Sequence, residues 1–366
     1  MGPRTFSYLD FKKFNMSFRN TLLFALPLAV AGAPSLLVND IPVKPRVVTT
    51  QARYDTDDPA IWVHPTDPAQ SLILGTDKDL DGALLVFGLD GVERKDLSVR
   101  GILRPNNVDL AMDIALGEGR VDVAVLTERY AHRLRAYSLP DMRPIDGVGI
   151  PIFEGDRARD GMGVALYRRP HDTALFAIVS RSDVGAPLDG YLHQYRLVDD
   201  GTGTLRGLFV RAFATWSGKK EIEALAVDSE LGYVYASDET HGIRKYLADP
   251  SAEDAEDELT VFGTEGFARD HEGISIYPTG PGTGYIVVSD QQADTFRIFP
   301  REGTATDPHD HPLLAVVKLS TDESDGSDVT AATLPGFPGG LFVAMSTDKT
   351  FHYYAWADIA QAAGLD

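Results

Sequence analysis

The chain has 366 residues, of which 54 are Asp or Glu and 34 are Lys or Arg, and its formal net charge is −20. This charge argues against nucleic acid and anionic membrane surfaces as default partners. The absence of Cys excludes disulfides, a Cys nucleophile and thiolate zinc sites, so any metal ion must be held by oxygen or imidazole ligands.

Residues 1–33 are expected to form an N-terminal extension and signal peptide. From Met16, a candidate for the true start, the sequence reads MSFRNTLLFALPLAVAGAP, with a basic residue, an apolar core and a small-residue cleavage pattern at 29–31. A membrane anchor is the weaker alternative, because the apolar core is shorter than the roughly 20 residues that span a bilayer. The pattern predicts a secreted or periplasmic protein, and no later segment is apolar enough for stable membrane insertion.

A pattern of one apolar strand, a short polar segment and a second strand rich in aromatic residues recurs six times. Its copies begin at Leu72, Val123, Phe176, Tyr233, Tyr285 and Leu341, at intervals of 51 to 57 residues. Another short strand behind a polar or acidic cluster precedes each copy, as in DDPAIWV at 57–63 and HEGISIY at 271–277. Each unit therefore holds at least three strands, with room for a fourth.

Repeats of about 50 residues with several short strands predict small sheets stacked around an axis. We therefore expect an all-β, six-bladed β-propeller that forms a single domain over residues 34–366. A large sandwich or jelly roll is the alternative. The only fair helix candidate is ADIAQAAGL near the C-terminus.

Acidic residues far apart in the sequence become neighbours in a propeller, because equivalent positions of all blades meet at one end of the central channel. The start of the first strand and the end of the second lie at that same end, since neighbouring strands are antiparallel. The polar residues at these positions are Asp55, Asp57, Asp58, Asp77, Lys78, Asn106, Asn107, Asp109, Glu128, Arg129, Asp160, Arg181, Asp183, Glu221, Glu223, Asp238, Glu239, Asp270, Glu272, Asp290, Asp322, Asp325, Asp328 and Asp348. So many carboxylates would repel one another unless metal ions bind, and oxygen ligands indicate calcium first and magnesium or manganese second.

For any one of these acids, a place in a turn beside backbone N–H groups is the better interpretation. Asp55 and Asp328 are interpreted in this way. The segments DHEG and EIEAL are different, because they place acids directly before the innermost strands. No spacing of histidines indicates a metal triad, and the histidines expected at the surface are His64, His171, His193, His352 and the two of HDH at 309–311.

The chain resembles the β-propeller phytases in seven motifs that follow one another in the same order. They are DTDDPAIWVHP, NNVD, EALAVDSELGYVYASDE, EGISIY, SDGSDV, GLFVA and FHYYAWADIA. The enzymes of this family use calcium to remove phosphate from phytate, myo-inositol hexakisphosphate. The resemblance extends from about residue 50 to the C-terminus, and the six-bladed fold that it implies agrees with the count of repeats.

The resemblance also implies which residues form the site. The implied calcium ligands are Asp58, Glu223, Glu239, Asp270, Glu272 and Asp325, with Asp57 and Asp322 as weaker candidates. The implied substrate-binding residues are Lys78, Asn106 and Asn107. We also expect Arg129 and Arg181 to bind phosphate as cationic donors. We expect Asp58, Glu223 and Lys78 to be catalytic.

The chain departs from the family pattern mainly in the substrate site. The family usually continues NNVD with an aliphatic residue, Arg and Tyr, whereas Leu110, Ala111 and Met112 follow it here. Met162 replaces the usual Tyr before the glycine of the third unit, and a usual lysine near the end of that unit's second strand is absent. We therefore expect the metal site to be better preserved than the substrate site.

The resulting hypothesis is a calcium-dependent 3-phytase, a phosphoric monoester hydrolase. Several Ca²⁺ ions would bridge the acidic protein and its anionic substrate phytate and would activate a water for attack on phosphorus. We expect a monomer that forms no covalent phospho-enzyme. The alternatives are a calcium-dependent lactonase or phosphotriesterase on the same scaffold, and a non-catalytic binding propeller that calcium stabilises.

Overall fold

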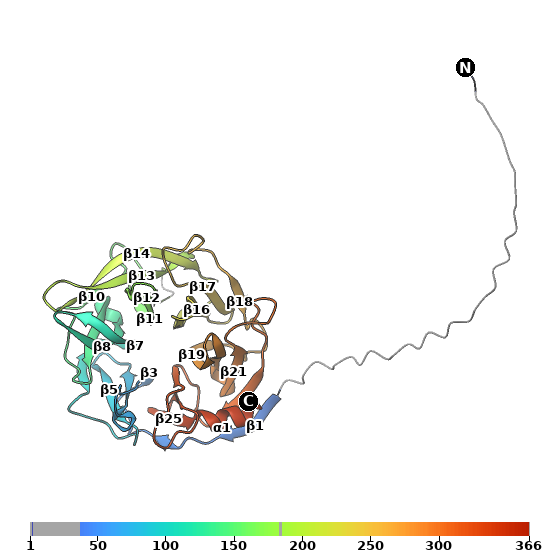
Figure 1. Ribbon diagram of the computed structural model, residues 1–366, viewed down its shortest axis with the longest axis horizontal. Coiled ribbons are helices and arrows are strands. Elements are labelled where there is room, and N and C mark those ends of the chain that lie inside the picture. The colour runs from blue at the N-terminus through green and yellow to red at the C-terminus, as the bar shows by residue number, and fades with distance from the viewer. Residues whose placement is uncertain (1, 3–36, 183–184, 366) are drawn as a thin grey trace. The chain divides into compact units, whose positions relative to one another are not determined.

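The computed structural model describes residue 2 and residues 37–182 and 185–365, and the predicted signal peptide lies outside this part of the chain apart from Gly2. From residue 37 onward the described chain forms a ring of six small sheets (Figure 1). The prediction of an all-β, six-bladed propeller is therefore confirmed. None of the helices in the described ranges is long and apolar enough to cross a membrane.

Four strands form each of the first three blades, counted along the chain. Blade 1 contains β3 (Thr56–Trp62), β4 (Leu72–Asp77), β5 (Gly82–Gly88) and β6 (Val99–Ile102). Blade 2 contains β7 (Pro105–Leu116), β8 (Gly119–Glu128), β9 (Arg133–Leu139) and β10 (Ile150–Pro151). Blade 3 contains β11 (Gly161–Arg168), β12 (Leu175–Arg181), β13 (Asp189–Asp199) and β14 (Leu205–Thr215).

The last two of the remaining three blades each borrow a strand from the N-terminal part of the chain. Blade 4 contains β15 (Ile222–Asp228), β16 (Tyr233–Asp238), β17 (Gly242–Leu247) and β18 (Thr260–Phe262). Blade 5 contains β19 (His271–Gly280), β20 (Thr283–Asp290), β21 (Thr295–Pro300), β22 (Ala315–Leu319) and β1 (Leu37–Val43). Blade 6 contains β23 (Ser327–Thr330), β24 (Leu341–Ser346), β25 (Thr350–Ala355) and β2 (Val47–Val48).

Three short 3₁₀ turns and one α-helix complete the described elements. The turns are η1 (Pro68–Gln70), η2 (Arg129–Ala131) and η3 (Gln291–Ala293). The helix α1 (Trp356–Ala363) lies where the sequence offered its only fair helix candidate, and it ends at Gly364, which adopts the left-handed conformation that glycine tolerates best.

The second strand of each blade is a short apolar run because its sheet packs between two neighbouring sheets. All six residues of β4 and of β24 are buried, which explains why these strands show no alternation of polar and apolar residues. The apolar clusters lie between blades, so that Leu74 of blade 1 packs in one cluster with Leu126 of blade 2. Burial of these faces on each other is the main force that holds the ring together.

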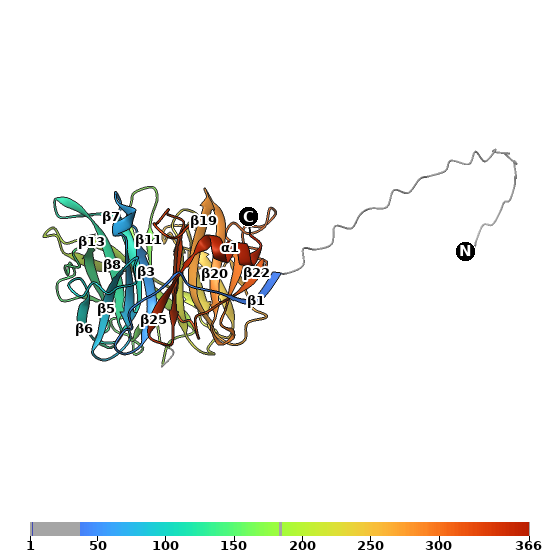
Figure 2. The same cartoon turned by 90° about the horizontal axis from the view of Figure 1, so that it is seen from below.

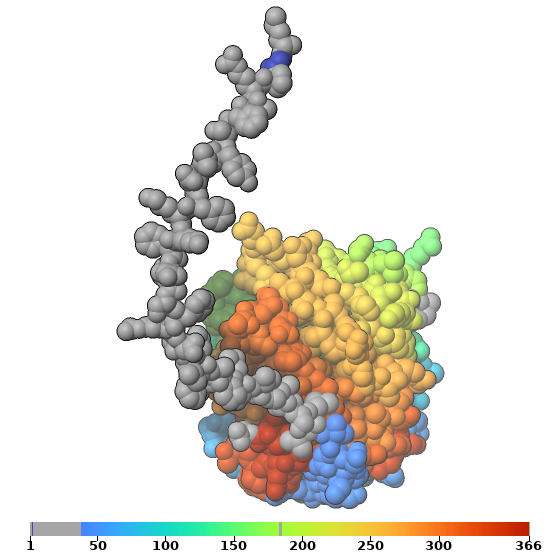
Figure 3. All heavy atoms as spheres, turned by 90° about the vertical axis from the view of Figure 1, so that its right-hand side faces the viewer, coloured from blue at the N-terminus to red at the C-terminus, as the bar shows by residue number. Residues whose placement is uncertain are grey.

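The ring is closed by the N-terminal strands. β1 pairs in parallel with β22, and β2 pairs antiparallel with β25. Figure 3 shows the blue β1 beside the red C-terminal residues and the orange residues of blade 5. At this closure Trp356 of α1 stacks on Tyr277 with ring centroids 4.0 Å apart.

The first strand of each blade lies nearest the axis and is called the inner strand. The polar segments at the starts of the inner strands and at the ends of the second strands lie on one side of the ring, and we call this side the mouth. Antiparallel pairing brings Thr56 opposite Asp77, for example, and Ile222 opposite Asp238. The inner strands β3, β7, β11, β15, β19 and β23 contact one another in sequence around the axis, and Figure 2 shows the ring from its side.

Three histidines expected at the surface are instead buried, and one of them lies in the loop before β22. His193, His352 and His311 are 9%, 7% and 4% exposed. Burial lowers the pKa of His193 and of His311 to about 4, so both are neutral members of the packed interior. The expectation for His193 and His352 was wrong, because their strands β13 and β25 are covered by neighbouring strands. It was also wrong for His311, whose Nε2 lies 3.1 Å from Lys245 Nζ.

Candidate metal centre and active site

A repeated irregularity in strand pairing places the predicted site residues at the mouth. In five blades the register shifts just after the first residue of the inner strand, so that a β-bulge lies at the same point of each. A bulge re-aims the side chains that it contains and interrupts the alternation of faces. The residues in these bulges include Asp57, Asp58, Asn106, Asn107, Glu223 and Glu272.

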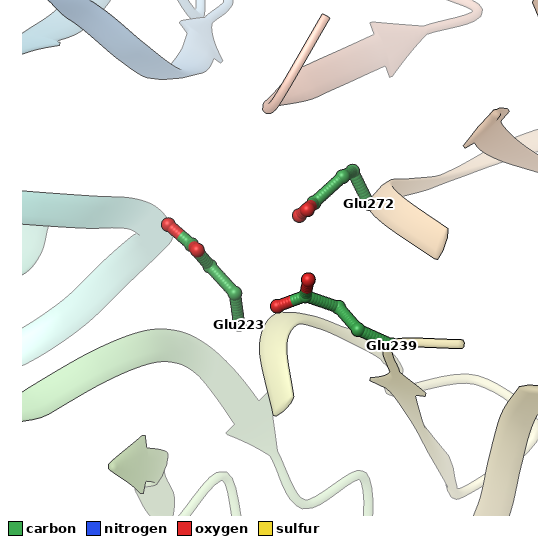
Figure 4. A group of neighbouring side chains, drawn as sticks. All are labelled: Glu223, Glu239 and Glu272. Atoms are coloured by element: carbon green, nitrogen blue, oxygen red, sulfur yellow. The ribbon is translucent and has the colours of Figure 1, made fainter. Parts of the chain in front are cut away.

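Three glutamates from two blades form the centre of the site. Glu223 lies in β15, Glu239 directly follows β16, and Glu272 lies in β19. Each can offer a carboxylate oxygen within 4.8 Å of the other two. Figure 4 shows the three carboxylates directed toward one another, an arrangement that can hold a metal ion.

A second group joins blades 1 and 6 to this centre. Lys78 Nζ lies 2.5 Å from Asp57 Oδ1 and 3.5 Å from Asp325 Oδ2. The side-chain amide of Asn106 donates to Asp57 Oδ2 at 3.0 Å and to Glu223 Oε1 at 2.6 Å. Asn106 therefore connects the aspartate group with the three glutamates.

A third group surrounds Asp270 and contains residues that the sequence analysis did not single out. Lys220 Nζ pairs with Glu239 and lies 3.0 Å from Asp270 Oδ2. Gln292 donates to that same oxygen at 2.8 Å, and Gln291 donates to Asp325. The signal for Lys220 was its place directly before the EIEAL segment, and the signal for the glutamines was their place directly after β20.

Burial and mutual repulsion keep these acids from ionising freely. Burial raises the pKa of Glu223 to about 8, with the neighbouring Asp57 adding to the shift. Burial likewise raises the pKa of Glu239 to about 7, although Lys220 opposes it. For Glu272, burial and then the charge of Glu239 raise the pKa well above its ordinary value.

The position of Lys78 has the opposite effect on its own charge. Burial by itself lowers the pKa of Lys78, but Asp57, Glu223 and Asp325 outweigh burial and hold the pKa well above its ordinary value. Burial raises the pKa of Asp325 to about 6, and Lys78 reduces the shift. Lys78 therefore stays positively charged, and this single charge does not neutralise all the carboxylates around it.

The residues of the mouth fit a calcium ion. Calcium prefers several oxygen ligands from carboxylates and amides, and these are the groups that converge here. Asp270 Oδ1, Glu272 Oε2 and Asn106 Oδ1 are buried without a hydrogen-bond partner among the described residues. A divalent cation would satisfy such oxygens and would also remove the repulsion among the glutamates.

Asp58, unlike Asp57, faces the channel. Together with Asp109 and Asp328 it lines a cavity at the axis. Each of the three carboxylates accepts a hydrogen bond from a backbone N–H of the next blade. The donors are Val108 N to Asp58 at 3.0 Å, Leu166 N to Asp109 at 2.6 Å and Ile61 N to Asp328 at 2.8 Å. Asp328 therefore links blade 6 to blade 1, and its carboxylate also accepts a hydrogen bond from Val329 N of its own blade. A ligand role for Asp58 stays a prediction.

Burial accounts for the state of these channel acids. It raises the pKa of Asp109 to about 7 and that of Asp328 to about 6. It also raises the pKa of Asp58 well above the ordinary value, against the hydrogen bond from Val108.

The remaining predicted residues differ in their relation to the mouth. Arg129 begins η2 beside the mouth end of β8. Asn107 is buried, and its Oδ1 lies 3.4 Å from Asn106 Nδ2. Asp322 is exposed, and Thr347 donates to its Oδ2. Within the described ranges no hydrogen bond or ion pair joins Asp322 to the three glutamates.

Arg181 belongs to the packing of blade 3. Its side chain is fully buried, with Nη1 2.7 Å from Asp156 Oδ2 and with Nε donating to Tyr191 O at 3.1 Å. The guanidinium also lies over the ring of Phe153 at 4.0 Å. This placement corrects the predicted phosphate contact, because the side chain holds its blade together instead of facing the mouth.

The two main departures from the family pattern fall on buried positions. Ala111 is 6% exposed and Met162 is 2% exposed. Ala111 packs in the apolar cluster between blades 2 and 3, and the carbonyl of Met162 accepts a hydrogen bond from Thr127 at 2.7 Å. Both residues therefore belong to the packed interior of the propeller.

Comparison with known proteins agrees with this geometry. The model of the Phytase family matches residues 38–362. A 3-phytase of Bacillus subtilis (strain 168) is 29% identical over 325 residues, which cover 84% of this chain and 81% of that enzyme.

Proposed function

The chain belongs to the phytase family, and on this premise we propose that it removes phosphate from phytate with calcium ions held at the propeller mouth. The similarity to a 3-phytase supports the substrate. The observation that supports calcium is the convergence of Glu223, Glu239 and Glu272, whose oxygens approach within 4.8 Å in a buried setting. The family match also disfavours the lactonase, phosphotriesterase and binding-only alternatives.

The residues proposed to hold the calcium ions are those that converge at the mouth. They are Asp57, Glu223, Glu239, Asp270, Glu272 and Asp325, with Asp58 on the channel side and Asp322 as an outlying candidate. When bound, calcium polarises phosphate oxygens and lowers the pKa of water that it coordinates. Phytate then loses one phosphate as water adds to phosphorus, the bond to the inositol oxygen breaks, and that oxygen gains a proton.

The cations of the chain bind and orient the substrate. Lys78 lies beside Asp57 and Asp325, so its ammonium can donate to a phosphate oxygen that approaches the same acids through calcium. Arg129 can donate from the rim between blades 1 and 2 as a planar guanidinium, which matches the geometry of phosphate. Asn106 holds Asp57 and Glu223 in position for the ion.

The test is phosphate release from phytate by the purified protein. We expect release in calcium, loss of release after calcium is removed with EGTA, and recovery when calcium is restored. Equal rates with and without EGTA would contradict the role of calcium. The absence of release at every calcium concentration would leave a binding protein as the better interpretation.

Export and a monomeric state complete the proposal. The basic, apolar and small-residue segments between 16 and 31 support secretion or export to the periplasm. N-terminal sequencing of the exported protein should give a start close to residue 32, and light scattering should give the mass of one chain.

A further inference from the structure

A cavity on the outer flank of blade 3 lies apart from the mouth. Its volume is about 350 Å³, and its walls are formed by Glu154, Asp156, His193, Tyr195, Phe209 and Ala212. The last four belong to β13 and β14, the two outer strands of the blade, and Figure 1 shows β14 at the periphery of the ring. The two acids come from the loop that joins β10 to β11. We call this cavity the side pocket, and its volume is typical of small-molecule sites.

Hydrogen bonds fix the tautomer of His193 in the side pocket. Phe153 N donates to Tyr195 Oη at 2.7 Å, so the hydroxyl proton of Tyr195 is free to donate to His193 Nδ1 at 3.1 Å. Burial lowers the pKa of His193 to about 4, and a neutral imidazole that accepts at Nδ1 carries its proton on Nε2. The carboxylate that approaches this Nε2–H is Asp156, whose Oδ2 lies 3.6 Å away, beyond the length of a hydrogen bond. His193 Nε2 is therefore an unpaired donor.

The two acids of the side pocket keep unpaired acceptors. Arg181 Nη1 lies 2.7 Å from Asp156 Oδ2, but Asp156 Oδ1 accepts no hydrogen bond from the described residues. Glu154 is exposed and forms neither a hydrogen bond nor an ion pair within the same ranges. Phe153, which precedes Glu154, has a φ of 51°, and strained backbone of this kind is concentrated at functional sites.

An exposed aromatic ring forms one wall of the side pocket. Phe209 is 57% exposed, and its ring centroid lies 5.0 Å from that of His193 and 5.9 Å from that of Tyr195. A single exposed aromatic residue is ordinary on a protein surface. This one borders a cavity that also holds one unpaired donor and two unpaired acceptors, and such a combination is typical of a ligand site.

The unpaired groups indicate the class of ligand. Within the described ranges, the acids and histidines that converge closely enough to hold a metal ion are the three glutamates of the mouth, so a metal ion does not explain the side pocket. An organic cation offers no acceptor to His193 Nε2, and an anion would be repelled by Glu154 and Asp156. An uncharged polyol satisfies all three groups, because each hydroxyl can both donate and accept. The C–H face of a polyol ring can also pack on an aromatic ring.

We propose that the side pocket binds an uncharged polyhydroxylated ring, which packs on Phe209, accepts from His193 Nε2 and donates to the carboxylates of Asp156 and Glu154. The sugar units of a saccharide have this chemistry, and so does a free myo-inositol ring. The inference goes beyond the proposed function, because none of these residues belongs to the metal centre.

The test is binding of four probes to the full, calcium-loaded protein, measured by saturation-transfer NMR and titration. The probes are maltose, cellobiose, lactose and myo-inositol. We expect saturable binding of at least one probe with a millimolar Kd, as is usual for a small polar ligand. Binding of a disaccharide without myo-inositol would assign the side pocket to saccharides, and tighter binding of myo-inositol would assign it to the free ring. Binding of none of the four, or of choline in preference to all of them, would overturn the inference.

Variants of exposed residues locate the binding. Phe209→Ala should weaken it about tenfold, because the aromatic face is lost, whereas Phe209→Tyr should retain it. Leu208→Ala is the matched control, since Leu208 is 54% exposed on the same strand and lies outside the walls of the side pocket. Its binding should match the wild type. Equal binding by Phe209→Ala and the wild type would overturn the inference.

Phytate hydrolysis separates this inference from the proposed function. Phe209→Ala and Glu154→Gln should keep the melting temperature and the kcat/KM for phytate of the wild type, because both residues lie away from the mouth. Polyol binding by a protein that does not hydrolyse phytate would support the side pocket and contradict the proposed function. Normal phytate hydrolysis without polyol binding would overturn the side pocket alone.

Discussion

The ammonium of Lys78 lies 2.5 Å from the carboxylate of Asp57, and the pair stands at the point where blades 1 and 6 meet the glutamates of blades 4 and 5. Lys78 also lies 3.5 Å from Asp325. One lysine is therefore shared by acids that are proposed to bind calcium. The same position would let it donate to a phosphate oxygen once calcium neutralises those acids.

Replacing Lys78 with Met should reduce activity far more than it reduces stability in calcium. Loss of a charge-assisted hydrogen bond typically costs about 1.5–3 kcal/mol, so kcat/KM for phytate should fall roughly 10- to 100-fold. The measurement is steady-state phosphate release at saturating calcium. Lys95→Met is the matched control, because Lys95 is exposed on the outer part of blade 1, and its kcat/KM should match the wild type. A Lys78→Met enzyme with normal kcat/KM would remove Lys78 from the site.

Replacing Glu272 with Gln should have opposite effects on stability with and without calcium. Burial, and then the charge of Glu239, raise the pKa of Glu272 well above its ordinary value, so folding without calcium at pH 8 must either bury this charge or keep the carboxyl protonated. The neutral amide removes that cost, and the free energy of unfolding should rise by about 1 kcal/mol. With calcium, the variant lacks one proposed ligand and should need about tenfold more calcium for the same stabilisation. Thermal unfolding across a calcium titration measures both effects.

The control for this variant is Glu265→Gln, which changes an exposed glutamate outside the mouth. It should alter neither the melting temperature in EGTA nor the calcium midpoint. A Glu272→Gln protein that is less stable than the wild type in both conditions would indicate a purely structural role for Glu272.

The sequence was sufficient to predict the ring and most of the mouth because both follow from the repeat. Equivalent strand ends must meet in a propeller, so Glu223 and Glu272 could be placed together although 49 residues separate them along the chain. Glu239 followed from the antiparallel pairing of β15 with β16. These deductions require only strand order and direction.

The parts that could not be predicted depend on features without a periodic signal. The bulge at the start of β3 decides that Asp57 contacts Lys78 while Asp58 lines the channel, and alternation of residues cannot reveal it. Arg181 resembles a mouth residue because it ends the second strand of its blade, but Asp156 from a preceding loop binds it in the interior. His311 is buried because the loop after β21 folds back onto Lys245, whose Nζ lies 3.1 Å from its Nε2.

The calcium-free protein should lose stability as the pH rises from 6 to 8. A carboxyl group whose pKa is raised on folding keeps a proton that the unfolded chain releases near its ordinary pKa, so its contribution to stability declines up to the folded pKa. Glu239, with a pKa of about 7, and Glu223, with a pKa of about 8, place the decline in this window. The melting temperature in EGTA should therefore fall between pH 6 and 8.

Calcium should cancel this dependence, because it replaces the protons that the acids otherwise keep. The increase in melting temperature on adding calcium should accordingly grow from pH 6 to pH 8. A calcium effect that is constant over this range, or a calcium-free protein that gains stability with pH, would contradict the assignment of these glutamates to the metal centre.

The pair of Arg301 with Asp228 should be essential for stability at the end of the ring opposite the mouth. Arg301 is 4% exposed, and its Nε and Nη2 lie 2.5 Å and 2.6 Å from the two carboxylate oxygens of Asp228, so blade 5 is joined to blade 4. Arg301→Ala leaves the buried carboxylate unpaired, which should lower the free energy of unfolding by about 3–5 kcal/mol. Chemical denaturation in calcium measures this loss.

Arg301→Met combined with Asp228→Asn should recover part of it, because neither partner is then charged. Arg120→Ala, which breaks an exposed pair with Asp113, should cost about 0.5 kcal/mol or less. A loss for Arg301→Ala as small as that of Arg120→Ala would show that apolar packing alone holds blades 4 and 5 together.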